Sequence, residues 1–271
     1  MKFTNIPDHN FPEAGQAFQR LLQIMDTLRG QCPWDREQTF QSLRHLTIEE
    51  VYELGDAILQ ESFNQIKNEL GDLLLHVVFY ARLGQENGAF SIVKVIDDLC
   101  QKLIDRHPHI YGQVKAEDSA TVKQNWEKIK LSKKNGSGVL SGVPVSLPSL
   151  VKAQRIQDKA AGIGFEWENK SDVWEKVEEE ILELKNAETM QQDKIEEEFG
   201  DVLFSLVNYA RFLKINAEDA LEKANRKFIK RFELMEQLAQ SRQLNIYEMD
   251  LKSLDALWNE AKIKKKVRKS S

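Results

Sequence analysis

The chain has 271 residues, of which 30% are charged, and its formal net charge of −5 at pH 7 argues against general nucleic-acid binding, which needs a basic surface. Its two cysteines, without CxxC spacing, indicate neither a disulfide framework nor a zinc cluster, and they fit a reducing cytoplasm. The N-terminus shows no apolar region typical of a secretory signal, and the longest apolar stretch, at 73–81, is far shorter than the roughly 20 residues of a membrane helix.

Helical spacing of apolar residues dominates the first half of the chain. It predicts helices near 13–28, 47–59, 62–83, 91–106 and 118–130. Ser91 has the position and chemistry of an N-cap. His107 and His109 flank Pro108, and we interpret them as a structural turn, because the proline breaks regular ligand geometry and no third ligand is nearby.

A segment rich in Gly, Ser and Pro, at 132–147, shows no helical period and is predicted to link two domains, at 1–131 and 148–271. The second domain repeats the helical pattern. Three of its predicted helices span 148–161, 217–242 and 251–264. Between the first two we expect a helix that is capped by Ser171 and carries EEILE, and another that follows a turn around Thr189 and carries EEEFGD. The basic stretch that ends the chain, at 262–269, is interpreted as a frayed, solvated terminus. Alternating strand patterns are nearly absent, so we expect an all-α fold of two related helical-bundle halves.

The two halves share an acidic pattern. Residues 49–53 read EEVYE and 69–72 read ELGD, against EEILE at 179–183 and EFGD at 198–201. Each copy also carries a Lys-x-x-x-Arg further along, namely Lys102 and Arg106, then Lys227 and Arg231. One EExxE alone is typical of a solvated helix face. Acid spacing that is kept through a duplication favours a metal site instead.

Residues three and four apart share one face of a helix, so the acids of each motif should project together. We expect the opposite face to be apolar and Gly200 to permit close helix approach. A ligand set made only of carboxylate oxygens indicates a hard cation, and the absence of Glu-x-x-His argues against di-iron. Mg²⁺ commonly shares its ligand shell with substrate phosphates, which neighbouring Lys and Arg side chains can also hold.

This ordered pattern resembles the MazG family of nucleoside triphosphate pyrophosphohydrolases. The resemblance covers essentially the whole chain and includes four further segments: CPWD at 32–35, RHPHIYG at 106–112, LPSLVKAQRIQ at 147–157 and GFEW at 164–167. It implies the family's all-α fold and hydrolysis between the α- and β-phosphates of a nucleoside triphosphate. Mg²⁺ would be the cofactor, with Mn²⁺ as the alternative ion. No Gly-Lys-Ser/Thr P-loop sequence occurs, so phosphates must be held by metal and side chains.

The resemblance also implies residue roles in the second copy. The metal ligands would be Glu180, Glu183, Glu198 and Asp201, with Glu197 adding to the shell. Glu179 would contact a second ion or orient the attacking water, so Glu179 and Glu180 are the candidate catalytic residues. Substrate contacts would come from Lys130, Lys176, Glu179, Lys194, Glu197, Asp201, Lys227, Arg231 and Trp258. Trp258 either packs on the nucleotide or belongs to the core of the last helix, whereas Tyr209 and Arg211 are interpreted as packing and surface residues.

The first copy keeps four matching acids, which are Glu50, Glu53, Glu69 and Asp72. Its neighbours differ, because Leu46 stands opposite Lys176, Gln65 opposite Lys194 and Asn68 opposite Glu197. Two phosphate-binding cations and one acid are therefore missing. We expect the C-terminal half to be the catalyst and the N-terminal half to be a degenerate, mainly structural copy.

Two alternatives stay open at this point: a narrower dUTP- or dCTP-directed pyrophosphatase, and a non-catalytic acidic helical scaffold. A homodimer is also expected, since the apolar residues of the EFGD helix run far round its circumference and relatives bury them between subunits. These residues are Phe199, Val202, Leu203, Phe204, Leu206 and Val207. Beyond the nucleotide and a second subunit, we expect neither a nucleic-acid nor a membrane partner.

Overall fold

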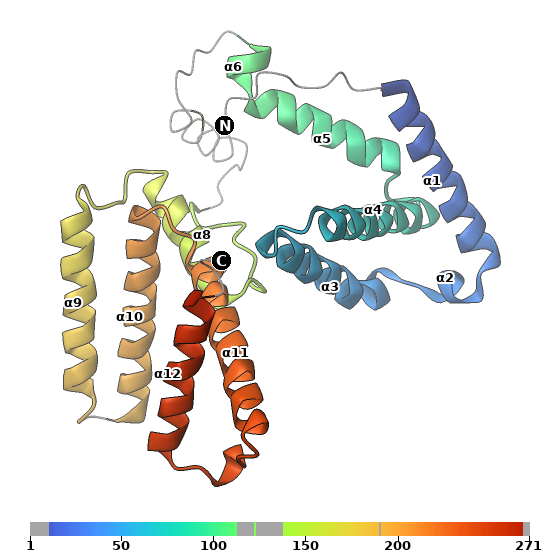
Figure 1. Cartoon of the computed structure of the whole chain (residues 1–271). Helices are drawn as coiled ribbons and strands as arrows, with labels where there is room; N and C mark the ends of the chain where they lie inside the picture. Colours follow the sequence, from blue (N-terminus) through green and yellow to red (C-terminus); the bar gives the residue numbers. More distant parts are fainter. Residues whose placement is uncertain (1–10, 113–121, 123–137, 190, 268–271) are drawn as a thin grey trace. The chain divides into compact units, whose positions relative to one another are not determined.

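The computed structural model of the chain describes residues 11–112, 122, 138–189 and 191–267. All regular structure in these residues is helical (Figure 1), which confirms the all-α prediction. None of the helices within these residues combines the length and the apolar character needed to cross a membrane. The chain divides into two compact units, Met1–Glu117 and Asp118–Ser271. The predicted domain boundary and the helix predicted at 118–130 fall largely outside the described residues.

The first unit is built on an α-helical hairpin. Its helices are α1 (Phe11–Gln31), α2 (Pro33–Glu37), α3 (Phe40–Leu59), α4 (Phe63–Glu86), α5 (Ile92–Arg106) and α6 (Pro108–Tyr111). Helices α3 and α4 pack side by side, and both α1 and α5 contact α4 (Figure 1). The core of this unit consists of Met25, Leu43, Val78, Phe79 and Leu83. Ser91 caps α5 as predicted, by accepting a hydrogen bond from the Lys94 backbone N–H, and Pro108 begins a new short helix after the turn at His107.

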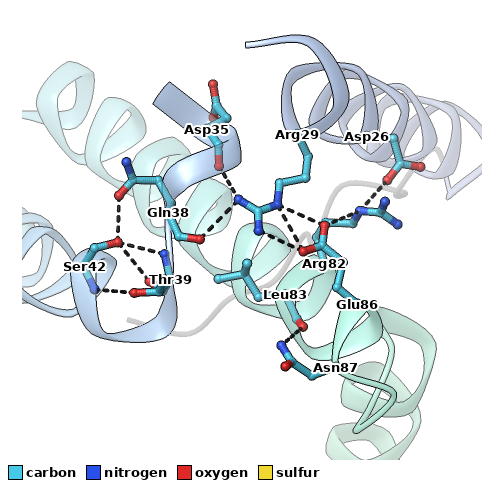
Figure 2. Close-up of polar contacts among 10 residues, drawn as sticks. All are labelled: Asp26, Arg29, Asp35, Gln38, Thr39, Ser42, Arg82, Leu83, Glu86 and Asn87. Atoms are coloured by element: carbon cyan, nitrogen blue, oxygen red, sulfur yellow. Dashed lines mark hydrogen bonds and ion pairs between the residues drawn. The ribbon is translucent and has the colours of Figure 1, made fainter. Parts of the chain in front are cut away.

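Arg29 ties three segments of the first unit together (Figure 2). Its Nε and Nη2 atoms donate to the two carboxylate oxygens of Glu86 on α4, at 3.0 and 2.8 Å. Its Nη1 atom donates to the backbone carbonyls of Asp35 and Gln38, on either side of the end of α2. The planar guanidinium supplies these donors in one fixed fork, which a lysine ammonium cannot reproduce. Arg29 therefore links the end of α2 to Glu86 on α4.

In the residues that the structure describes from 138 onward, the second unit contains two helical hairpins and one further helix. Its elements are α8 (Ser149–Ala161), α9 (Lys170–Ala187), α10 (Gln192–Phe212), α11 (Ala217–Ser241), a 3₁₀ turn (Ile246–Glu248) and α12 (Leu251–Val267). Helices α9 and α10 lie side by side, as do α11 and α12 (Figure 1), and α8 contacts both α10 and α11. A core of Met235, Leu238, Ala239, Leu257 and Ala261 joins α11 to α12. The described part of the predicted linker, 138–147, forms turns.

Four local expectations were wrong. The N-cap of α9 is Asn169, and Ser171 lies inside the helix with its hydroxyl bonded to Asp172. A Cβ atom at Gly200 would meet nothing within 4 Å, so this glycine does not permit close helix approach within the chain. The basic terminus is helical as far as Val267 rather than frayed. The acids and the apolar residues of α9 do not occupy opposite faces, because Val173, Val177 and Glu180 are all buried at helical spacing.

Candidate functional site

Three carboxylates from two helices converge between α9 and α10. Oxygen atoms of Glu180 and Glu183, on α9, and of Glu198, on α10, all lie within 4.8 Å of one another. Glu180 and Glu183 meet because they are three residues apart on one helix, and Glu198 joins them because α10 packs alongside. Glu180 and Glu198 are buried, whereas Glu183 is exposed. The structure thus brings together three of the four predicted metal ligands in a partly enclosed cluster.

Two lysines neutralise the buried members of this cluster. Lys176 Nζ lies 2.8 Å from Glu180 Oε1, and Lys194 Nζ lies 2.8 Å from Glu198 Oε1. The Glu180 and Glu198 side chains are each only 10% exposed, so without these cations two negative charges would be buried close together. Each lysine also pairs with the acid one residue before the buried glutamate: Lys176 lies 2.9 Å from Glu179, and Lys194 lies 2.9 Å from Glu197. The predicted phosphate-binding lysines therefore lie directly on the predicted metal ligands.

The electrostatics of the cluster match this geometry. Desolvation raises the pKa of the Glu183 carboxyl, and the charges of Glu180 and Glu198 raise it further. Desolvation likewise raises the pKa of Asp201, the fourth predicted ligand, and the same two glutamates add to the shift. These shared influences place Asp201 in the field of the cluster. Hydrogen bonds to Glu180 and Glu198, respectively, raise the pKa of Lys176 and of Lys194, which keeps both lysines charged.

The first copy forms a cluster that shares two of its three positions with the second, and no cation among the described residues shifts the pKa values of its glutamates. Oxygen atoms of Glu50, Glu69 and Asp72 lie within 4.8 Å of one another. Desolvation raises the pKa of both Glu50 and Glu69, and every charge that shifts them, including that of Glu53, comes from a carboxylate. In the second copy Lys176 lowers the pKa of Glu183, which shows what the first copy has lost by carrying Leu46 at this position. The acid spacing of the two copies is conserved, but their charge balance is not.

The remaining predicted substrate residues lie on α11 and α12. Lys227 is exposed, and Arg231 lies one helical turn further along α11. The Arg231 guanidinium stacks over the Trp258 ring at 4.7 Å from its centroid, and its buried Nε has no hydrogen-bond partner. Trp258 also contacts Phe228, at 4.9 Å between ring centroids, and packs on the α11–α12 core. Of the two interpretations of Trp258, core packing is present in the structure. Lys130 lies outside the described residues.

A cavity of about 700 Å³ adjoins the cluster and was not anticipated from the sequence. Lys176, Glu180 and Asp201 form part of its wall, and most of the remaining wall is apolar. The aromatic contributions come from Phe165, Trp167 and Phe204. The GFEW segment at 164–167, noted only for its resemblance to a family, thus supplies part of the wall of this cavity.

Arg211 and Glu166 also line this cavity, and they form an ion pair at 2.5 Å. The Arg211 side chain is only 15% exposed, so the interpretation of Arg211 as a surface residue was wrong. Tyr209, in contrast, packs against Trp174 with ring centroids 4.8 Å apart, as a packing residue should. The only sequence signal for Arg211 was that the letters YAR occur in both halves, at 80–82 and at 209–211, and such a repeat by itself carries no chemistry.

The donor set fits a hard divalent cation. Neither acidic cluster in the described residues contains His or Cys, and oxygen-only ligation is typical of Mg²⁺, Ca²⁺ and Mn²⁺. Basic side chains within bonding distance of the ligands suit a partner that is itself anionic, such as a phosphate chain that shares the ion. A purely structural metal site would have no use for them.

Comparisons with known proteins agree with this geometry. A family model described as the MazG nucleotide pyrophosphohydrolase domain matches residues 38–111 and 169–235, once in each half. The nucleoside triphosphate pyrophosphohydrolase/pyrophosphatase MazG of Thermotoga maritima is 45% identical over 254 residues, which is 92% of this chain and 97% of that protein. A nucleoside triphosphate pyrophosphohydrolase of Escherichia coli is 43% identical over 252 residues, or 90% and 96% of the two chains. Another of that name, from Mycobacterium tuberculosis, is 36% identical over 56% of this chain and 47% of its own length. Both acidic motifs lie inside the matched segments.

Proposed function

The chain belongs to the MazG family of nucleotide pyrophosphohydrolases, and from this membership we propose that it hydrolyses nucleoside triphosphates to monophosphates and pyrophosphate in its C-terminal half. The observation that carries the proposal is the contact of Lys176 and Lys194 with Glu180 and Glu198, each at 2.8 Å. Carboxylates for a metal and cations for phosphates occupy the same few ångströms. That combination suits a metal–triphosphate complex and distinguishes the site from an acidic scaffold.

We propose Mg²⁺ as the cofactor, held by Glu180, Glu183, Glu198 and Asp201, with Glu197 beside them and Mn²⁺ as a substitute. When bound, the ion would neutralise phosphate charge and make a water molecule a competent nucleophile near neutral pH. Loading the site requires the two lysines to leave the metal ligands. Their long, flexible side chains can then donate to phosphate oxygens while their backbones stay fixed.

Glu179 is the proposed orienting residue for the attacking water. It is exposed, it bonds Lys176 at 2.9 Å, and it neighbours Glu180 in the chain. When Lys176 turns to the substrate, the Glu179 carboxylate is free to accept a proton from water. Lys227 and Arg231 on α11 are proposed to hold the outer phosphates, and the unpartnered Nε of Arg231 is a donor suited to an anion. Lys130 stays a proposed phosphate contact on the evidence of the resemblance alone.

We also propose that the protein acts as a homodimer in the cytoplasm. Phe199, Leu203 and Leu206 form an apolar stripe along α10 and are each at least 40% exposed. Gly200 adds open space next to this stripe, since a Cβ there would meet no atom within 4 Å. A second copy of the chain would cover the stripe, and a dimeric mass by light scattering at micromolar concentration is the expected result. Cys32 and Cys100 are both free, as suits a reducing compartment.

The catalytic proposal is tested by product analysis. The purified protein is incubated with Mg²⁺ and a panel of ribo- and deoxyribonucleoside triphosphates, and pyrophosphate and orthophosphate are measured separately. We expect pyrophosphate as the primary product, no turnover in EDTA, and recovery on adding Mg²⁺ or Mn²⁺. Orthophosphate as the primary product, or full activity in EDTA, contradicts the proposal. Turnover of dUTP or dCTP alone would instead establish the narrower pyrophosphatase.

A further inference from the structure

A single ion pair fixes the segment 162–168, which follows α8 and leads to the N-cap of α9, against α10. Arg211, in the last turn of α10, places Nη2 2.5 Å from Oε1 of Glu166 in this segment. Within the residues that the structure describes, no other side chain of 162–168 forms a hydrogen bond, an ion pair or a ring contact. The three large apolar side chains of the segment are each at least 47% exposed. Because few buried contacts hold the segment, its position depends on this pair.

Arg211 is already fixed by its neighbours on α10. Its Nε and Nη2 atoms both donate to Oδ1 of Asn208, at 3.3 and 2.9 Å. The guanidinium also lies over the ring of Phe212, 5.2 Å from the centroid, and the Arg211 side chain is mostly buried. Such burial strengthens the attraction between opposite charges, and a guanidinium that is held in place loses little freedom when it binds a carboxylate. Arg211 is therefore a fixed point on α10 to which the segment is attached.

The segment borders the proposed catalytic cluster. Residues 163–167 line the cavity of about 700 Å³, and Lys176, Glu180 and Asp201 line it as well. A ligand that is bound at the cluster and extends into the cavity therefore meets this segment. If the segment left α10, the ligand would lose one wall of its site. The acids of the cluster would stay in place, because α9 and α10 pack directly on each other.

We propose that Arg211 is a positioning residue for the reaction, and that its ion pair with Glu166 holds segment 162–168 in the conformation that completes the cavity. The inference rests on the function proposed above. When only a fraction of the molecules has the binding-competent conformation, the apparent affinity is reduced to that fraction. The Glu166 side chain is 35% exposed, so loss of the pair should lower this fraction about 10-fold, at the low end for a hydrogen bond to a charged group.

The test is steady-state pyrophosphate release from Mg–ATP by Arg211→Met and by Glu166→Met. Each variant should raise KM about 10-fold and keep kcat within about threefold of the wild type, since the acids and lysines of the cluster are untouched. Glu166→Met separates two explanations. It removes a negative charge from the site of an anion, so charge alone predicts a lower KM, whereas loss of the anchor predicts a higher one. The double variant should match the single variants, because all three lose the same interaction.

A second measurement follows the segment directly. Chymotrypsin cleaves after aromatic residues, so cleavage after Phe165 and Trp167 should be at least about threefold faster in both single variants. Arg82→Met is the matched control, because Arg82 holds the equivalent position in the first copy and pairs with Asp26 and Glu86, at 3.3 and 3.4 Å. It should leave KM and cleavage of the segment as in the wild type.

Three results would overturn the inference: an unchanged KM in both single variants, a KM below that of the wild type for Glu166→Met, or unaltered cleavage of the segment. If Arg211→Met does not fold by circular dichroism, Glu166→Met gives both readouts from the more exposed partner. Absence of any pyrophosphate release by the wild type overturns the proposed function instead. The cleavage rates then still decide whether the ion pair holds the segment.

Discussion

The proposal that the C-terminal half is the catalyst is tested most sharply by giving that half the residues of the N-terminal half at two positions. Lys176→Leu and Lys194→Gln install the residues that occupy the equivalent positions, Leu46 and Gln65. Both lysines lie 2.8 Å from a proposed metal ligand, so each is within reach of a phosphate oxygen that shares the ion. A hydrogen bond to a charged group contributes about 1.5–3 kcal/mol, so the double variant should lose roughly 3–6 kcal/mol of transition-state stabilisation. This corresponds to a fall in kcat/KM of about 10²- to 10⁴-fold.

The assay is pyrophosphate release from ATP at saturating Mg²⁺, with folding checked by circular dichroism. Saturating metal is needed because removing the lysines leaves Glu180 and Glu198 without their cations. Lys185→Leu, at an exposed position in the last turn of α9, is the control for loss of positive charge and should stay within about threefold of the wild type. A double variant that is folded and also within threefold of the wild type would refute the assignment of these lysines to the phosphates.

Three further outcomes are expected. Glu180→Gln should lower pyrophosphate release by about 10²-fold or more, whereas the equivalent Glu50→Gln should leave most of it; the reverse result would move catalysis to the N-terminal half. Arg29→Lys should destabilise the first unit by about 1.5–3 kcal/mol in urea unfolding, because lysine cannot maintain both the Glu86 pair and the carbonyl contacts at the end of α2; an unchanged midpoint would show that the contacts of Arg29 are dispensable. Burial lowers the pKa of His76 below its ordinary value of 6.5, so the unfolded chain binds the proton more readily, and stability should fall as pH drops through about 6.5. His76→Gln should flatten that part of the profile measured by thermal unfolding, and an unaltered slope would assign it to other groups.

The helices were predictable because their signals are local. The helix expected over 62–83 is α4, Phe63–Glu86, and Ser91 caps α5 because a hydroxyl before a helical run bonds the first backbone N–H groups wherever the helix lies. The same rule misplaced the start of α9, where Asn169 and Ser171 are two residues apart and either could cap. Which of the two residues is the N-cap depends on the backbone conformation between the GFEW segment and α9. Helix propensity carries no information on that conformation.

The acids of the site were also predictable, but their surroundings were not. Spacing of three and four residues on one helix places carboxylates together whatever the fold. Whether that face meets solvent or another helix depends on tertiary packing, which buried Glu180 and Glu198 and left the apolar Phe199 exposed. The cavity was invisible for the same reason. Gln157 and Trp167 come from separate segments of the chain, and they line one cavity only because α8 packs against α10.

The ion pairs of Lys176 and Lys194 with the proposed metal ligands affect how metal and nucleotide enter the site. Lys176 and Lys194 act as resident counter-ions for Glu180 and Glu198, the two buried carboxylates of the site. A bare divalent ion that displaces them releases two ammonium groups, each of which must find another anion. An incoming metal–triphosphate complex provides that anion at once, so ion and nucleotide should enter as one unit. Occupancy would then follow the concentration of the metal–triphosphate complex rather than that of free metal alone.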